Sequence, residues 1–225
     1  MPTVIVPAPG PPPVCNLSTA EVEQFVDTLA TYHAYFAPAF RRPEQATWAA
    51  VYLNGLLSDQ PRKTSERIAL TQGCNVRDLQ HFIGQSSWVS APLIARHQQL
   101  VAQTLGSADG VVLIDESGVV KQGDDSVGVA RQYCGAVGKV ANCQVGVYLG
   151  YASSKGYTLV DGRLYLPESW FAADHARQRA QSGVPDEVIF QTKPALALTL
   201  LQEAVRRGCA LWRHACVSGW GCRSG

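Results

Sequence analysis

The sequence lacks any run of about 18 apolar residues, the length at which a membrane-spanning helix is expected. Its first residues, MPTVIVPAPGPPPV, contain no basic residue and are interrupted by proline, so they do not fit a secretory signal peptide. These absences predict a cytoplasmic protein with no membrane partner. Because 46% of its 225 residues are hydrophobic, the chain has enough apolar material for a sizeable core.

A strong excess of either charge is also missing. The chain has 19 Lys and Arg residues against 18 Asp and Glu residues, which gives a formal net charge of +1. Nucleic-acid-binding proteins usually carry a basic surface, because neutralised phosphates release their counterions. The overall charge therefore argues mildly against DNA binding, although a local basic patch remains compatible with a neutral total.

Neither a disulfide framework nor a standard zinc motif is present. Seven cysteines, an odd number in a chain without a secretion signal, predict reduced thiols. Cys134 and Cys143 are interpreted as small buried hydrophobic residues. Four residues near the C-terminus are of types that bind zinc: Cys209, His214, Cys216 and Cys222. Their spacing includes no CxxC pair, which disfavours a zinc site.

The N-terminal part is predicted to be helical after a proline-rich lead. Residues 1–16 are rich in proline, which donates no backbone hydrogen bond, and we expect them to be disordered. Ser18 and Glu21 have the spacing of a capping box and start a first helix. Pro43 suits the first turn of a second helix, which Gly55 is expected to loosen.

One more helix is predicted from Ser90 to Leu105, where His97 falls among the apolar positions and is interpreted as a buried or half-buried core residue rather than a ligand. This helix completes a helical domain over residues 17–106. We expect that domain to contact DNA ends or a second copy of itself.

Within this domain, residues 64–72 and 76–85 have the pattern of two short helices around a turn at Gly73, with Asn75 as N-cap. This arrangement is typical of a helix-turn-helix. The polar side chains expected on the second helix suit base edges or phosphates; they are Arg77, Gln80, His81 and Gln85. The alternative is two helices of a bundle with a solvated face, which the acidic Asp78 on that face favours.

The second half is predicted to form a sheet that begins with VVLIDESG, residues 111–118. Apolar, mostly β-branched residues run into Asp115 and a Ser-Gly turn follows, so this segment predicts a buried strand that carries a carboxylate at its end. Two further strand-rich stretches, residues 126–154 and 156–170, predict an antiparallel meander. Taken alone, the segment around Asp115 would also fit an ordinary turn.

Four segments carry a family resemblance: LIDESG, SVGVARQYCGAVGKVANCQVGV, RLYLPESW and TKPALALTLLQEA. Together they resemble the DDE-type insertion-sequence transposases over roughly residues 35–208. The resemblance implies an α+β protein in which the helical domain precedes a partial ribonuclease-H-like domain at residues 107–225, an incomplete mixed sheet with a packed helix. It further implies cleavage and strand transfer at the ends of a mobile element, with Mg²⁺ as cofactor and the terminal repeats as DNA partner.

The resemblance also implies which residues act. By its place in the family motif, Asp115 matches the first of three catalytic acids and a Mg²⁺ ligand, whereas Glu116 points to the opposite face of the strand. Arg131 and Arg163 lie inside the matching segments and are predicted to contact phosphates. Three lysines near the expected turns fit solvated positions as well as phosphate contacts; they are Lys121, Lys139 and Lys155.

The sequence departs from the family pattern after a helix predicted over residues 193–207. In a ribonuclease-H-like core the next strand ends in the second acid, but residues 209–220 contain none and Glu203 is the last carboxylate side chain. Residues 209–225 have the composition of a frameshifted tail. We therefore expect a truncated or frameshifted transposase that is inactive alone. The alternative is a DNA-end-binding or dimerising regulator that pairs with itself or with the full-length enzyme.

A second enzyme class also has a strand that ends in a reactive Asp. Haloacid-dehalogenase-like phosphatases use such an Asp as nucleophile, and they require a second Asp two residues later. This chain has Ser117 at that position. The sequence therefore argues against a phosphatase of that class.

Overall fold

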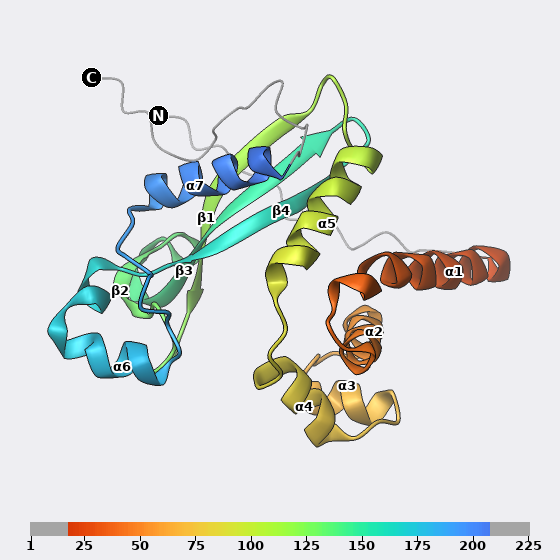
Figure 1. Cartoon of the computed structure of the whole chain (residues 1–225), viewed down its shortest axis with the longest axis horizontal. Coiled ribbons are helices and arrows are strands. Elements are labelled where there is room, and N and C mark those ends of the chain that lie inside the picture. Colours follow the sequence, from red (N-terminus) through yellow and green to blue (C-terminus); the bar gives the residue numbers. More distant parts are fainter. Residues whose placement is uncertain (1–17, 208–225) are drawn as a thin grey trace. The chain divides into compact units, whose positions relative to one another are not determined.

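The computed structural model describes residues 18–207, which belong to two compact units that divide between Val89 and Ser90 (Figure 1). Helices make up the first unit, and an antiparallel sheet with helices makes up the second, so the α+β class is confirmed. No helix among the described residues is long and apolar enough to cross a membrane. The predicted proline-rich lead and the atypical tail lie outside the described residues.

Four α-helices and one short 3-10 turn form the first unit: α1 (Thr19–Phe36), η1 (Ala37–Ala39), α2 (Pro43–Leu57), α3 (Ser65–Thr71) and α4 (Val76–Gly84). The predicted capping box of α1 is confirmed, because the Ser18 backbone N–H donates to Glu21 Oε2 at 2.7 Å and the Glu21 N–H donates to Ser18 Oγ at 3.3 Å. The Ser18 hydroxyl, which also donates to Glu21 Oε2 at 2.7 Å, and the Ser18 backbone N–H lower the pKa of the Glu21 carboxyl, since they stabilise its charged form.

The core of this unit lies between α2, α3 and α4 and is formed by Ile68, Ala69, Leu79 and Phe82. The expected loosening of α2 at Gly55 is wrong, because the helix continues to Leu57 and Gly55 is buried. A Cβ at position 55 would lie 2.2 Å from Ile68 Cγ2. Glycine therefore allows α2 to approach α3 closely at this point.

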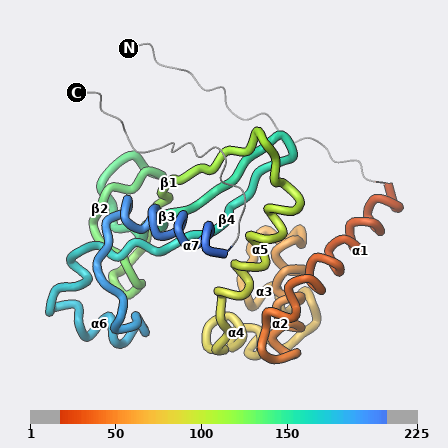
Figure 2. Tube along the Cα trace, turned by 45° about the horizontal axis from the view of Figure 1, so that its top comes forward, coloured from red at the N-terminus to blue at the C-terminus, as the bar shows by residue number. Residues whose placement is uncertain are grey.

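Strand β3 (Lys139–Ser153) is the centre of the sheet in the second unit (Figure 2). It pairs along one edge with β1 (Val111–Val120), and along the other edge with β2 (Ala130–Cys134) and then β4 (Gly156–Tyr165). The predicted meander captured β1, β3 and β4 but missed β2, which the turn η2 (Gly135–Val137) joins to β3. All pairings among the described strands are antiparallel.

Strand β1 is longer than predicted. It continues to Val120, so the expected turn at Ser117 and Gly118 is wrong, and Asp115 lies in the middle of the strand. Gly118 is buried inside β1, where a Cβ would lie 2.8 Å from Cys134 Sγ. The glycine thus marks a close approach within the sheet rather than a chain reversal. Cys134 and Cys143 are both fully buried, as predicted.

Helices α5 (Ser90–Thr104) and α7 (Lys193–Arg206) pack on one face of this sheet. The shared core contains β-branched and leucine side chains from both layers; among them are Val101, Val112, Ile114, Leu149, Leu196 and Leu200. The segment between β4 and α7 holds η3 (Glu168–Phe171), η4 (Ala173–His175) and α6 (Ala176–Gln181). Helix α5, which was predicted within residues 17–106, therefore belongs to the unit that contains the sheet.

Candidate functional site

Asp115 lies on the face of the sheet that points away from α7. In β1 the buried residues Val112 and Ile114 alternate with the exposed Leu113 and Asp115, so the carboxylate is on the solvent side. Across the ladder it pairs with Tyr148 of β3. Its Oδ1 accepts the Glu116 backbone N–H at 2.8 Å, which holds one carboxylate oxygen near the strand.

A cavity of about 420 Å³ opens beside Asp115 on this face. It is lined by residues of the three strands β1, β3 and β4; they are Leu113, Asp115, Tyr148, Gly150, Tyr151, Tyr157, Thr158 and Leu159. The lining is mostly aromatic and aliphatic, and Asp115 supplies its one carboxyl group. Leu159 and Tyr157 keep 62% and 87% of their surfaces exposed, which makes this an unusual apolar surface to leave in water.

Glycines determine how Tyr148 lies within this cavity. A Cβ at Gly162 would be 2.8 Å from Tyr148 Cδ1, and a Cβ at Gly146 would be 2.6 Å from its hydroxyl oxygen. The ring therefore lies flat over both positions. The sequence reasoning missed Tyr148 and Tyr157 as site residues, although the glycines around Tyr148 were a signal that a side chain or ligand lies close to the backbone there.

Glu116 points to the opposite face, as predicted. Its Oε2 forms an ion pair with Lys193 Nζ at 2.5 Å, at the start of α7. The Lys193 ammonium group also lies 5.3 Å from the centre of the Tyr165 ring. This contact ties β1 to α7 and separates Glu116 from Asp115 by the thickness of the sheet.

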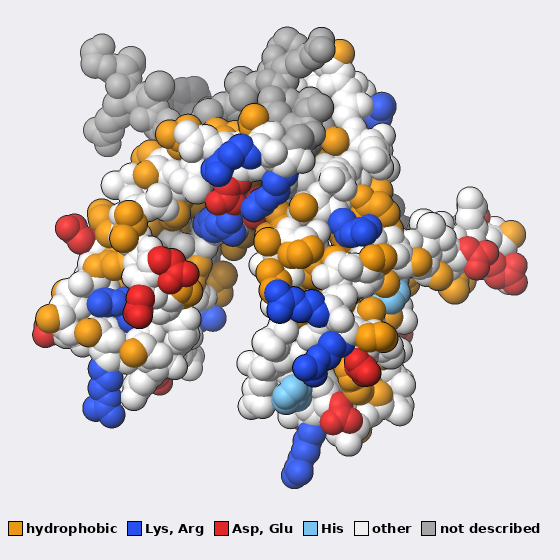
Figure 3. Space-filling view, viewed as in Figure 1, with side chains coloured by type: hydrophobic (Ala, Val, Ile, Leu, Met, Phe, Trp, Pro, Cys, Tyr) orange, Lys and Arg blue, Asp and Glu red, His pale blue; other side chains and the backbone are white. Residues whose placement is uncertain are grey.

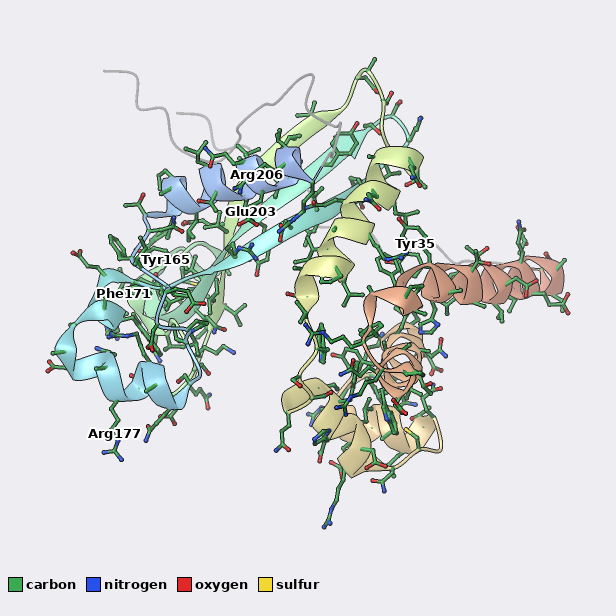
Figure 4. All side chains as sticks on the ribbon, in the orientation of Figure 1. Tyr35, Tyr165, Phe171, Arg177, Glu203 and Arg206 are labelled. Carbon is green, nitrogen blue, oxygen red and sulfur yellow. The ribbon has the colours of Figure 1, made fainter. Side chains whose placement is uncertain are left out.

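Two further acids, Asp161 and Glu203, belong to an ion-pair network between β4 and α7. Glu203 accepts hydrogen bonds from Arg163 at 2.6 Å and from Arg207 at 2.9 Å. Arg207 also donates to Asp161 Oδ2 at 3.0 Å. Figure 4 shows Glu203 between α7 and the sheet, and Figure 3 shows basic and acidic side chains gathered there. Arg163, predicted to contact phosphate, is thus already engaged with a carboxylate.

The described residues do not provide a Mg²⁺ site around Asp115. No group of three His, Cys, Asp or Glu side chains that could hold a metal occurs within residues 18–207. Glu116, Asp161 and Glu203 all lie on the other face, each paired with a lysine or arginine. A single exposed carboxylate among tyrosines and leucines offers too few oxygen ligands for a pair of divalent ions. The candidate zinc ligands after residue 207 lie outside the described part of the chain.

Helices α3 and α4 form the predicted helix, turn and helix in the first unit. Gly73 adopts the left-handed conformation with φ of 65°, and the Asn75 side chain accepts the Arg77 N–H at 2.9 Å as an N-cap. On α4, Leu79 and Phe82 face the core, while the predicted DNA-contacting side chains Arg77, Gln80 and His81 are exposed. Asp78 is exposed in the same helix, so the charge of this surface is mixed.

Arg131 is the remaining residue predicted to contact DNA. It is exposed in β2 and pairs with Asn142 of β3, at a distance of six residues along β3 from the partner of Asp115. At about 3.3 Å per residue this separation is roughly 20 Å. The structure therefore does not bring Arg131 and Asp115 into one site.

Comparison with known proteins places these features in a family. Residues 35–212 match the family described as the DDE superfamily endonucleases. The chain belongs to the DDE endonuclease superfamily. A probable transposase for insertion sequence element IS701 from Microchaete diplosiphon is 31% identical over 191 residues, which cover 84% of this chain and 46% of that protein. This DDE chain thus spans about half the length of that relative. No solved structure matches it.

Proposed function

We propose that this DDE-superfamily chain is part of an insertion-sequence transposase that binds the ends of the element, and that it contributes Asp115 as one acid of the cutting site. The observation that carries the proposal is the position of Asp115, in the middle of β1 on the open face of the sheet, in a chain similar to a probable transposase. Its place in the LIDESG motif supports the same role.

By this proposal, the chain alone does not cut DNA. Cleavage with Mg²⁺ needs several carboxylates that hold the metal against the attacking and leaving oxygens. Within residues 18–207 no group of three such ligands forms and no other acid lines the cavity beside Asp115, while Glu116 and Glu203 are paired with basic side chains on the opposite face. The chain would therefore bind DNA through its surface and leave the phosphodiester bonds intact.

DNA contact is proposed for the exposed face of α4. Arg77 and His81 can reach phosphates, and Gln80 can donate to or accept from a base edge. In the sheet unit, Arg131 is exposed and suits a further phosphate contact, whereas Arg163 would first have to leave Glu203. The mixed charge around Asp78 predicts modest affinity that falls as salt rises.

A gel shift on duplex DNA that carries the terminal inverted repeats of the element tests this proposal. We expect a shifted band at low salt, and Arg77→Ala to weaken binding roughly 5- to 10-fold, because a charge-assisted phosphate contact is lost. Arg177→Ala is the matched control, since Arg177 is an exposed arginine on α6 (Figure 4) and its loss should leave the shift unchanged. Absence of any shift at low salt, or equal effects of both variants, would reject DNA binding through α4.

Helix α1 favours the alternative proposal, a regulator that pairs with itself or with the full-length enzyme. Its N-terminal half carries Val22, Phe25 and Val26 at helical spacing, with 46%, 53% and 58% of their surfaces exposed. Such a stripe is typical of a helix that packs against another. Light scattering of the free protein tests the self-pairing. A mass of one chain, 24.3 kDa, at all concentrations would reject it.

A further inference from the structure

Two tyrosine side chains, Tyr148 and Tyr157, border the cavity beside Asp115. Tyr148 lies flat over Gly146 and Gly162, and Tyr157 on the neighbouring strand β4 is 87% exposed at the same opening. Gly150 of β3 also lines the cavity, and because it carries no side chain the strand backbone is open at that point. Aromatic side chains on an open sheet face are a common platform on which unpaired nucleic-acid bases stack.

The charge in the cavity narrows the choice of ligand. The carboxyl group of Asp115 lies among Leu113, Leu159 and the two tyrosines, and the Glu116 N–H donates only to its Oδ1. An apolar protein surface laid over this cavity would bury the carboxylate without a donor, which is costly. A nucleobase with an exocyclic amino group offers both a flat apolar ring and N–H donors at its edge.

We propose that this cavity binds one unpaired nucleobase that carries an exocyclic amino group, with its ring stacked on the tyrosines and its amino group donating to Asp115. The inference rests on the proposal that DNA is the partner of this chain. It applies to the chain without metal, in which Asp115 is the one acid of the described residues that lines the cavity. The base must be unpaired, because pairing occupies its amino edge and stacking in a duplex covers its ring.

The experiment uses single-stranded DNA without Mg²⁺. A short deoxycytidine oligonucleotide with one 2-aminopurine is titrated with the full chain, and both the fluorescence of the 2-aminopurine and the anisotropy of the oligonucleotide are measured. Stacking on a tyrosine quenches 2-aminopurine, so we expect quenching that saturates. The affinities are compared by anisotropy with end-labelled oligonucleotides that contain no 2-aminopurine, because that base itself carries an exocyclic amino group. The deoxycytidine oligonucleotide should bind about tenfold tighter than the thymidine one, because thymine lacks an exocyclic amino group.

Two variants test the two halves of the site. Tyr157→Ala should weaken binding at least 5-fold, since one base stack is worth about 1 to 3 kcal/mol. Because the Tyr157 side chain is exposed, its removal should leave the fold intact. Asp115→Leu should reduce the affinity for deoxycytidine to that for thymidine and leave thymidine binding unchanged. Tyr133→Ala is the matched control, because Tyr133 is 56% exposed on β2 and does not line the cavity.

Four results would overturn the inference: no quenching with the unaltered chain, equal binding of both oligonucleotides, an unchanged Tyr157→Ala variant, or quenching that millimolar Mg²⁺ abolishes. Self-association that disappears in Tyr157→Ala would show that a second copy covers the cavity instead.

Arg77→Ala separates this inference from duplex binding through α4. It should weaken the duplex shift and leave the quenching intact, so either proposal can fail without the other.

Discussion

Trp170→Ala is expected to lower the free energy of unfolding by about 4 kcal/mol, in the range of large aromatic deletions from a core. Trp170 is only 1% exposed, and its Nε1–H donates to the Val129 carbonyl oxygen at 2.9 Å. This contact joins η3 to the residue that precedes β2, so its loss leaves a cavity and an unsatisfied buried carbonyl group. Urea denaturation followed by circular dichroism measures the change.

Two control variants separate packing from hydrogen bonding at this position. Trp170→Phe keeps most of the ring and should cost about 1 to 2 kcal/mol, because mainly the hydrogen bond is lost. Trp88→Ala should cost less than Trp170→Ala, since Trp88 is 37% exposed in the other unit. A loss below about 1 kcal/mol in Trp170→Ala would contradict the packing described for η3.

The second large effect is expected for Arg207→Ala, which removes the guanidinium group beside Asp161. The Asp161 side chain is 1% exposed, and breaking a buried ion pair typically costs about 3 to 5 kcal/mol. We expect about 2 kcal/mol, a smaller loss, because Arg207 is partly exposed and Gln98 still donates to Asp161 at 3.3 Å. Thermal and urea unfolding both report the change.

Arg206→Ala is the matched control for this prediction. Arg206 is the preceding residue in α7, and its side chain donates to the Gln202 carbonyl oxygen of the same helix. The control should change stability by less than about 0.5 kcal/mol. Equal losses in both variants would show that the contact between Arg207 and Asp161 does not stabilise the packing of α7 on β4.

Local signals predicted much of the fold because they depend on neighbouring residues alone. The capping box at Ser18, the N-cap at Asn75 and the apolar face of α7 are all confirmed. Gly55 and Gly118 were misinterpreted because glycine in a sequence marks either a break or a close approach. Only the tertiary neighbours, Ile68 and Cys134, decide between these.

The site was less predictable, because it depends on which faces are covered. Strand alternation was sufficient to separate Asp115 from Glu116. It did not reveal that Tyr157 of β4 lies at the same cavity as Tyr148 of β3, because that neighbourhood depends on the pairing register and on the bulge near Leu149 and Gly150. Likewise the buried polar residue of α5 is Gln98, whereas His97 is half-buried and contacts the Leu159 carbonyl oxygen.

The measurement that tests the central claim most directly is a nicking assay on plasmid DNA that carries both ends of the element. It is run with Mg²⁺ or Mn²⁺ and at a protein concentration that saturates the element ends in the gel shift. The account predicts bound but uncut DNA, because no other acid of the described residues lines the cavity beside Asp115. Nicking that disappears in Asp115→Ala would contradict it, and would show that this chain completes a catalytic metal site on its own.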